Sequence, residues 1–255
     1  MPTWDPRQYL KFSDHRLRPA LDLLTQIPLD NPHRVYDLGC GPGNITRLLA
    51  ERWPAAEVVG VDSSVDMLVK ARQEAPGIAF VQAGIEQWSP PAPVDLLFTN
   101  STLQWLDDHA RLFPRLLAQL ASQGVLAVQM PHNHDAPSHA AMREAAEEGP
   151  WRAQLQAVRS IRPVGAPADY YRILAPVARK IDIWETEYLH VLEGDSPVVE
   201  WTKGTGLRPY LDALEEPERG AFLAAYAARI AALYPKQPDG RTLLPFRRLF
   251  ILTRI

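Results

Sequence analysis

An acid followed by three alternating glycines carries the strongest chemical signal in this chain. Residues 37–43 read Asp-Leu-Gly-Cys-Gly-Pro-Gly. Glycine lets the backbone turn sharply and approach a ligand closely, because it has no Cβ. A helix that starts at Asn44 would point its free N–H groups toward this loop. The pattern therefore predicts a ligand-binding loop between a strand and a helix.

Three classes of ligand compete for such a loop. A phosphate-binding P-loop needs Gly-Lys-Ser or Gly-Lys-Thr, which this segment lacks. A dinucleotide fingerprint needs G-x-G-x-x-G, but its third glycine falls on Asn44 when counted from Gly39, and on Thr46 when counted from Gly41. The third class is a cationic nucleoside without phosphate. We favour it, because the carboxylate of Asp37 would attract such a ligand and repel a pyrophosphate.

Asp62 supplies the second chemical signal, because it ends the next expected strand after the loop. A carboxylate in that place accepts hydrogen bonds from both hydroxyls of a ribose. The alternative is a helix cap for the segment that starts at Ser64. With the glycine loop upstream, we favour the ribose.

The glycine loop and the run Val61-Asp-Ser-Ser64 together resemble the first two motifs of the class I S-adenosylmethionine-dependent methyltransferases. The resemblance implies a seven-stranded sheet with an antiparallel last strand, and it implies S-adenosylmethionine as the methyl donor. The residues that it implies for the cofactor are Asp37, Gly39, Gly41, Asn44, Asp62, Ser63, Met67, Ala83, Gly84, Ile85, Asn100, Ser101 and Leu103.

One position departs from the family pattern. After the third strand the family often has an acid that contacts the adenine amine, and here Gly84 takes that place. We expect the adenine to lie against the backbone of residues 83–85, with Gln82 or Glu86 as substitutes for the acid. We interpret Cys40 as a small buried filler of the turn and not as a nucleophile.

Further segments are similar to one bacterial branch of this superfamily, whose members methylate a carboxylate of a small tricarboxylic acid. The likeness covers nearly the whole chain and is weakest at residues 132–168. It implies a monomethyl ester and S-adenosylhomocysteine as products. The segments that carry it are 4–19, 100–106, 125–131, 182–186 and 201–210.

Such a methyl transfer needs no general acid or base. A carboxylate has a pKa of about 4, so at neutral pH it is already the nucleophile. No general base is required, and we expect none. The enzyme needs to hold oxygen, methyl and sulfur in line, with the reacting atoms roughly 3–3.5 Å apart. Because a cation and an anion lose charge together, removal of water from the site should help.

A tricarboxylate must also be anchored by cations, and arginine forms the best fork for a carboxylate. We expect Arg16, Arg18 and Arg208 around the acceptor. The alternative for any one of them is a solvated surface charge. The further candidates for the acceptor are Tyr9, Gln104, Trp105, His132, Tyr170, Tyr171, Trp201 and Arg247.

The elements that must position these residues alternate between strand and helix as far as residue 131. This alternation is typical of a parallel sheet covered on both faces. In such open sheets, ligands bind beyond the carboxyl ends of the strands. The expected strands are 33–38, 57–61, 78–81, 94–98 and 124–130, and the expected helices are 44–52, 64–74 and 108–120.

The second half of the chain adds helices at 138–148 and 195–235, and strands at 177–192 and 247–254. Together with the resemblance, this predicts a doubly wound, seven-stranded, mostly parallel α/β sheet of Rossmann-like type with a helical cap. We expect residues 1–131 to form the cofactor-binding core with an N-terminal lid segment. Residues 132–255 would supply the remaining strands and the cap, at about 132–175 and 195–240.

Composition limits the partners. The 255 residues carry 27 basic and 30 acidic side chains, so no basic excess favours a nucleic acid. One cysteine forms no internal disulfide. We see no secretory signal or membrane span and expect no metal, so we expect a cytoplasmic monomer or weak homo-oligomer with a small carboxylate substrate. The rival hypotheses are a methyltransferase for another acid, acyl chain or hydroxyl, and a non-catalytic cofactor-binding or nucleic-acid-associated protein.

Overall fold

The structure, a computed structural model, describes residues 13–156, 158 and 164–255, with side chains of the first helix from residue 17 onward. The chain divides into two units. The first, here called the sheet unit, comprises residues 16–131, 164–186 and 248–255. The second, here called the helical unit, includes the described parts of 132–163 and 187–247.

A seven-stranded sheet with the order β3-β2-β1-β4-β5-β7-β6 organises the sheet unit. The first five strands pair in parallel, and β7 is antiparallel to β5. This topology confirms the expected fold class. The strands are β1 (Arg34–Leu38), β2 (Glu57–Asp62), β3 (Ala79–Gln82), β4 (Val94–Asn100), β5 (Leu120–Pro131), β6 (Lys180–Leu192) and β7 (Thr242–Arg254).

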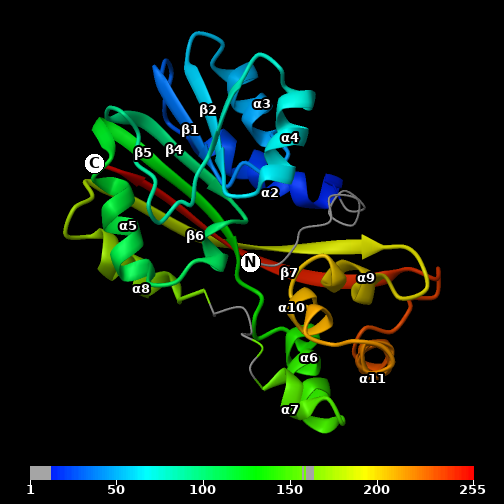
Figure 1. Cartoon of the computed structure of the whole chain (residues 1–255). Helices are drawn as coiled ribbons and strands as arrows, with labels where there is room; N and C mark the ends of the chain where they lie inside the picture. The colour runs from blue at the N-terminus through cyan, green and yellow to red at the C-terminus, as the bar shows by residue number, and fades with distance from the viewer. Residues whose placement is uncertain (1–12, 157, 159–163) are drawn as a thin grey trace. The chain divides into compact units, whose positions relative to one another are not determined.

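Helices cover both faces of this sheet (Figure 1). On one face, α3 (Asn44–Arg52) and α4 (Val65–Glu74) contact β1, β2 and β3, and on the other face α5 (His109–Leu117) contacts β5. The central strands are buried on both sides, which explains their continuous apolar runs. The core therefore lies on both faces of β1 and β4, directly below the loops that follow them.

Two helices of the sheet unit were not expected from the sequence. The first, α2 (Ser13–Gln26), contains Pro19, and the second, α8 (Pro167–Leu174), is only eight residues long. We expected the cap to extend to residue 175. Instead α8 packs against α5 in the sheet unit, because the ring of Tyr170 is buried beside that of Phe113 at 5.1 Å.

The expected helix at 108–120 ends earlier, at Leu117. Leu120 already belongs to β5, where it pairs with Val94 of β4. The hydroxyl of Ser64 caps α4 and accepts the backbone N–H of Met67 at 3.3 Å. The start of α4 thus sets the length of the connection after β2, and the end of α5 sets that of the connection before β5.

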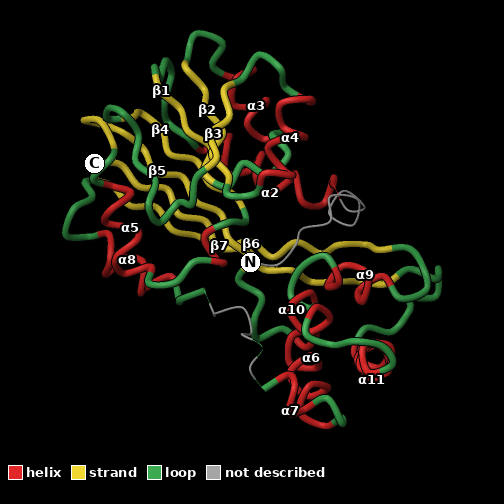
Figure 2. Tube along the Cα trace, viewed as in Figure 1, coloured by secondary structure: helices red, strands yellow, loops and turns green. Residues whose placement is uncertain are grey.

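The helical unit has its own hydrophobic core, in which Trp201, Phe222 and Tyr226 are fully buried. Its helices, seen as red coils in Figure 2, are α6 (Pro137–Glu148), α7 (Arg152–Leu155), α9 (Pro197–Lys203), α10 (Arg208–Asp212) and α11 (Glu218–Leu233).

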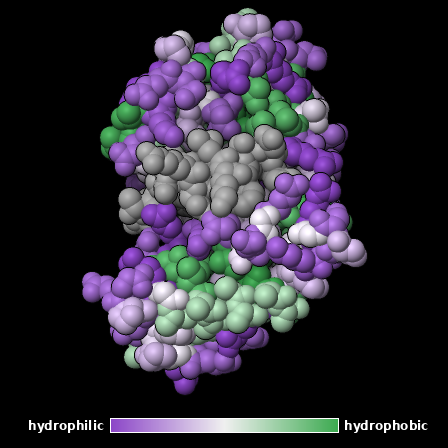
Figure 3. Space-filling model, turned by 90° about the vertical axis from the view of Figure 1, so that its right-hand side faces the viewer, coloured by the Kyte–Doolittle hydropathy of each residue, from purple (hydrophilic) through white to green (hydrophobic). Residues whose placement is uncertain are grey.

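The expected helical segment 195–235 is thus three helices. Pro209 lies in the first turn of α10, and Pro217 directly precedes α11. The exposed face of α11 carries alanines, such as Ala224 and Ala228, which favour a helix without adding a large apolar side chain. Figure 3 shows pale, weakly hydrophobic residues of this kind gathered in a band on the helical unit.

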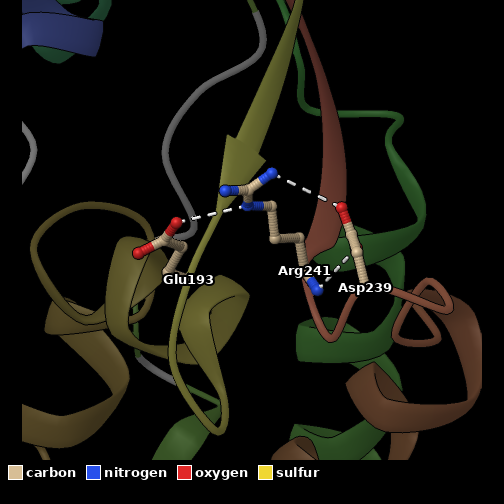
Figure 4. Close-up of polar contacts among 3 residues, drawn as sticks. All are labelled: Glu193, Asp239 and Arg241. Carbon is tan, nitrogen blue, oxygen red and sulfur yellow. Dashed lines mark hydrogen bonds and ion pairs between the residues drawn. The ribbon is translucent and has the colours of Figure 1, made fainter.

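Strands β6 and β7 run from one unit into the other, so residues 187–192 and 242–247 belong to the helical unit. An exposed arginine stands just before β7 begins. The guanidinium of Arg241 contacts Glu193 at 3.2 Å and Asp239 at 3.5 Å, and its backbone N–H donates to Asp239 at 3.0 Å (Figure 4). This is a surface ion pair whose contribution to stability is small.

Candidate active site

The parallel strands bring the expected cofactor residues to one edge of the sheet. The carboxyl ends of β3, β2, β1, β4 and β5 follow one another along this edge in that order. The direction in which the strands are added reverses between β1 and β4. In open α/β sheets such a reversal leaves a crevice where ligands bind. Gly39, after β1, and Ser101, after β4, therefore lie beside the place where a ligand is expected.

The glycine loop is held against β2 by its backbone. The N–H groups of Gly39 and Cys40 both donate to the carbonyl of Val61, at 2.7 and 3.0 Å. A Cβ on Gly39 would lie 2.2 Å from the side chain of Thr102, whereas a Cβ on Gly41 would meet nothing within 4 Å. Both glycines have positive φ, 74° and 53°, a region that L side chains avoid. Gly39 is thus required by packing, and Gly41 borders open space that a ligand can enter.

Asp62 joins the loop to α4. One carboxylate oxygen accepts the backbone N–H of Gly41 and the other that of Ser64, each at 2.8 Å. The cap of α4 is Ser64, so the helix-cap alternative for Asp62 is wrong. Asp62 instead holds the capping residue and the loop, and the sequence did not indicate the bond to the loop. Each carboxylate oxygen accepts up to two hydrogen bonds, so the half-buried side chain keeps capacity for ribose hydroxyls.

Asp37 lies beneath the loop and is only 2% exposed. The hydroxyl of Thr46 donates to its carboxylate at 2.7 Å. Burial raises the pKa of Asp37 to about 7, although the bond from Thr46 acts in the opposite direction. The side chain is thus poised to lose its proton at neutral pH when a cation approaches. Cys40 is buried as expected, and burial raises the pKa of its thiol, which keeps it unreactive.

The turn after β3 lies next to Asp62. The backbone N–H of Ala83 donates to the carbonyl of Asp62 at 3.0 Å, and the carbonyl of Gly84 accepts the N–H of Trp88 at 2.9 Å. Ala83 and Gly84 are half-buried and Ile85 is buried. This arrangement can present backbone and an apolar side chain to a flat base. Gln82 and Glu86 are exposed.

The segment after β4 turns sharply. Ser101 has a positive φ of 54°, and the hydroxyl of Thr102 lies 3.1 Å from the carbonyl of Asn100 and 3.3 Å from that of Gly39. The side-chain amide of Gln104 is buried and donates to the carbonyl of Ser101 at 2.8 Å. The side-chain oxygen of Asn100 is buried without a hydrogen bond in the described part of the chain. A ligand donor is the natural partner for such an oxygen.

A buried arginine that was not predicted from the sequence adjoins this segment. Arg248 of β7 is 3% exposed, and its Nη1 donates to the hydroxyl of Ser101 at 3.3 Å and to the side-chain oxygen of Gln129 at 3.4 Å. The arginine predicted from the sequence is its neighbour Arg247, which is exposed. A usable signal was the alternation at the start of β7, where Leu244, Phe246 and Arg248 are buried and Pro245 and Arg247 are exposed.

Behind the same segment, His109 ties Leu103 to Tyr170. The Nε2 of His109 lies 2.8 Å from the carbonyl of Leu103, and its Nδ1 lies 2.7 Å from the hydroxyl of Tyr170. Because a carbonyl only accepts, Nε2 carries the proton, and the tyrosine hydroxyl donates to Nδ1. The hydroxyl of Tyr170, an expected acceptor contact, is therefore engaged with His109, and it also accepts the N–H of Gly165 at 3.3 Å.

The remaining residues that were expected to bind the methyl acceptor lie in different surroundings. In the sheet unit, Tyr171 is 58% exposed, Trp105 is half-buried and Arg18 is exposed, 3.9 Å from Asp22. Tyr9 and the side chain of Arg16 lie outside the described residues. The cofactor residues Asn44 and Ser63 are exposed at the starts of α3 and α4, Met67 is buried in α4, and Leu103 is buried after β4.

In the helical unit, Arg208 pairs with Asp212 at 3.4 Å within α10. The ring of Trp201 is buried 5.5 Å from that of Phe246, as a core side chain would be. His132 is half-buried, and its backbone N–H donates to the carbonyl of Arg247 at 2.9 Å. None of these three contacts by itself indicates a ligand-binding site.

Two further properties of the described residues bear on the class of protein. They contain no group of three or more His, Cys, Asp and Glu side chains that could hold a metal ion. Within the same part of the chain, every helix is too short or too polar to cross a membrane.

Known structures agree with the fold. The YcgJ protein from Bacillus subtilis superposes with a TM-score of 0.61 at 14% identity, over 94% of this chain and 98% of that one. A phosphoethanolamine N-methyltransferase 2 from Haemonchus contortus, solved with S-adenosylhomocysteine, superposes with a TM-score of 0.56 at 17% identity. That superposition covers 92% of this chain and 52% of that one. At such identities the likeness shows the fold alone.

Sequence relatives are far more similar. Residues 35–124 match the methyltransferase domain family. A trans-aconitate 2-methyltransferase from Azoarcus sp. strain BH72 is 56% identical over 252 residues, which is 99% of both chains. Its counterpart from Rhodopseudomonas palustris strain BisB18 is 54% identical, again over 99% of both. The resemblance expected from segments such as 4–19 and 201–210 is thereby confirmed. The chain belongs to the trans-aconitate 2-methyltransferase family of the class I methyltransferases.

Proposed function

We propose that this chain transfers the methyl group of S-adenosylmethionine to one carboxylate of trans-aconitate, or of a closely related small polycarboxylate. The products are a monomethyl ester and S-adenosylhomocysteine. The observation that carries this proposal is identity above 50% over nearly the full length with relatives named for this activity. The Asp37 loop and Asp62 supply the physical support.

The residues along the sheet edge fit the cofactor. The open space beside Gly41, the lone pairs of Asp62 and the buried oxygen of Asn100 suit a ligand that bears hydroxyl and ammonium donors. When bound, S-adenosylmethionine supplies an electrophilic methyl group on a cationic sulfur. We propose the contact residues that the family resemblance implies: Asp37, Gly39, Gly41, Asn44, Asp62, Ser63, Met67, Ala83, Gly84, Ile85, Asn100, Ser101 and Leu103.

The order of strands along the edge suggests which residues would hold each part of the cofactor. The turn after β3 would hold the adenine, Asp62 after β2 the ribose, and Gly39 after β1 with Asn100 at the end of β4 the methionine part. The chain's work is to orient the donor and the acceptor in line and to exclude water, because the acceptor carboxylate is already ionised at neutral pH.

The decisive experiment is a panel of small acids. The purified protein is incubated with S-adenosylmethionine that carries a labelled methyl group and with trans-aconitate, cis-aconitate, citrate, or a fatty acid. We expect a labelled monomethyl ester, detected by mass, from trans-aconitate at a far higher rate than from the others. Asp66→Asn, an exposed acid in the first turn of α4, serves as the active control, and Asp62→Asn as the impaired variant.

The other outcomes separate the rival functions. Ester formation on another acid alone would assign a different acceptor to the same chemistry. Tight binding of the cofactor without transfer to any acid would leave a non-catalytic binding protein. Either result would overturn the proposed activity, and the first would keep the methyltransferase class.

For the acceptor we also retain Arg208, Arg16 and Arg18 from the sequence. Arg208→Ala should raise the KM for trans-aconitate about tenfold and leave the affinity for the cofactor nearly unchanged, as expected for loss of one charged hydrogen bond. Wild-type kinetics in that variant would remove Arg208 from the proposal. A cytoplasmic monomer or weak homo-oligomer remains a prediction.

A further inference from the structure

The methyl acceptor needs a place on the edge of the sheet that the cofactor does not use. In the proposed function, the cofactor occupies the edge from β3 to β4, and the next strand along this edge is β5. Near its carboxyl end β5 carries Gln129, which pairs with Asn100 at the end of β4. Paired residues of neighbouring strands carry their side chains on the same face of a sheet. Gln129 thus lies beside Asn100, on the side where the acceptor is expected.

Two donors hold the side-chain amide of Gln129 in one orientation. Its oxygen accepts from Nη1 of Arg248 at 3.4 Å and from the hydroxyl of Ser101 at 3.1 Å. An arginine N–H only donates, so the atom that faces it is the oxygen of the amide and not the nitrogen. These two bonds use both lone pairs of the oxygen. All three residues belong to the sheet unit, so the amide is fixed before any ligand binds.

The nitrogen of the same amide has an unused hydrogen-bonding capacity. Gln129 is fully buried, and its Nε2 has no acceptor among the residues that the structure describes. A buried N–H group without an acceptor costs free energy, which a ligand oxygen in that place recovers. The amide of Gln129 is therefore a preformed donor for a ligand.

Asn100 and Gln129 present opposite kinds of atom at this edge. The unpartnered atom of Asn100 is an oxygen, which suits the ammonium group of the cofactor, whereas that of Gln129 is an N–H donor, which suits a carboxylate. Because an amide is neutral, it fixes one carboxylate oxygen without neutralising the negative charge. The carboxylate then keeps the charge that makes it a nucleophile.

We propose that the side-chain amide of Gln129 donates a hydrogen bond to a carboxylate of the acceptor and so determines which acids bind beside the cofactor. This inference rests on the proposed function. One competing role is structural, because the oxygen of Gln129 joins β5 to Ser101 and Arg248. The other competing role is binding of the carboxylate on the methionine part of the cofactor.

Two substitutions of Gln129 separate these roles. Gln129→Glu keeps an oxygen for Arg248 and Ser101 and replaces the N–H donor with a second oxygen. Gln129→Met fills a similar volume and lacks both polar atoms. The control is Gln123→Glu, which adds the same charge at an exposed position of the same strand. Calorimetry measures the affinity for S-adenosylhomocysteine, and then for acids on the saturated protein, while thermal melts report folding.

The acids differ by one carboxylate. Itaconate, glutaconate and mesaconate each lack a different one of the three carboxylates of trans-aconitate. We expect Gln129→Glu to weaken trans-aconitate roughly 100-fold or more, because a donor to a charged group becomes a like charge, and Gln129→Met to weaken it about 10-fold. In Gln129→Glu, the acid that lacks the contacted carboxylate should lose at least about tenfold less than trans-aconitate. The affinity for S-adenosylhomocysteine should change less than about twofold.

The order of the two variants decides between the roles. If Gln129→Glu binds every acid like the wild type and Gln129→Met is the weaker binder, Gln129 is structural. A loss that is equal for all four acids, or that Gln123→Glu shares, would likewise overturn the inference. A loss confined to S-adenosylhomocysteine would assign the amide to the cofactor. If the wild-type protein binds S-adenosylhomocysteine but none of the acids, the proposed function falls, and this inference falls with it.

A measurement on the wild-type protein guards against misfolding of the variants. With ¹⁵N-labelled glutamine, the side-chain amide signal of Gln129 should shift when trans-aconitate is added to the complex with S-adenosylhomocysteine. The acid that lacks the contacted carboxylate should leave this signal in place. A signal that stays unchanged with trans-aconitate bound would refute the contact.

Discussion

The carboxylate of Asp62, at the end of β2, accepts the backbone N–H of Gly41, in the loop after β1, at 2.8 Å. The residue expected to bind the ribose therefore also sets the shape of the loop that would bind the methionine part. Its second oxygen holds Ser64, the cap of α4. One side chain thus couples the two halves of the proposed cofactor site.

Asp62→Asn tests this coupling. The amide group places an N–H opposite one of two backbone N–H groups, so one of the bonds must be lost. We expect the free energy of unfolding to fall by about 1–3 kcal/mol and the affinity for S-adenosylhomocysteine to fall at least tenfold, as measured by chemical denaturation and calorimetry. The matched control is Asp66→Asn on the exposed face of α4. An Asp62→Asn protein with wild-type affinity would show that the carboxylate serves only the fold.

Gly41→Ala separates ligand approach from stability. The added Cβ enters open space, so the cost to folding is only that of a positive φ, about 1–2 kcal/mol. The affinity for the cofactor should fall more than tenfold, because the Cβ occupies the space that the ligand needs. Calorimetry and a thermal melt measure the two effects separately.

Gly240→Ala is the control for that experiment. Gly240 also has a positive φ, of 81°, and its Cβ would likewise meet nothing within 4 Å, but it belongs to the helical unit. It should lose similar stability and keep wild-type affinity. Equal affinities in the two variants would remove Gly41 from the cofactor site.

Much of the sheet could be predicted from the sequence because its signals are local. The glycine loop, the apolar strands and the start of α3 at Asn44 each depend on residues next to one another in the chain. The helix α8 escaped prediction for the opposite reason. It is short, and it is stabilised by burial of Tyr170 against Phe113, which is distant in the sequence.

The site shows the same division. The bond from Asp62 to Gly41 joins residues that the sequence had already singled out, but the bond itself depends on the pairing of β1 with β2. Arg248 was not predicted because its contacts, Ser101 after β4 and Gln129 in β5, are distant from it in the sequence. Arg247 and Arg248 are adjacent in the sequence, and only the register of β7 against β5 decides which one is buried.

Tyr170→Phe tests the link behind the segment after β4. Removal of the hydroxyl takes away the donor to Nδ1 of His109 and the acceptor for the N–H of Gly165. The imidazole then keeps only its hydrogen bond to Leu103. The free energy of unfolding should fall by about 1 kcal/mol, and kcat should fall a few fold because Leu103 is less firmly placed. Tyr171→Phe, on the exposed neighbour, should change neither in the same denaturation and turnover assays. Full activity and stability in Tyr170→Phe would show that His109 needs no donor at Nδ1.

Asp37 predicts a dependence of stability on pH. Its pKa rises on folding, to about 7 from an unfolded value near 4, because the side chain is buried. The folded state thus holds this proton more tightly than the unfolded chain. The resulting stabilisation is complete below about pH 4 and is lost as the pH rises from about 4 to about 7. Asp37→Asn has no such proton. The free energy of unfolding of the wild type should therefore fall by up to roughly 4 kcal/mol relative to that variant between pH 4 and pH 8.

Binding of the cofactor should depend on pH in the opposite direction to stability. A cationic ligand beside Asp37 favours the ionised carboxylate, so binding releases the proton and tightens as the pH rises through about 7. We expect the affinity for S-adenosylmethionine to increase up to about tenfold between pH 6 and pH 8 in the wild type, and to stay nearly flat in Asp37→Asn. Thr46→Val removes the hydroxyl that favours the ionised form, so it should move the wild-type transition to higher pH. If the affinity depends on pH in the same way in the wild type and in Asp37→Asn, the titrating group is not Asp37, because the variant lacks that carboxyl group.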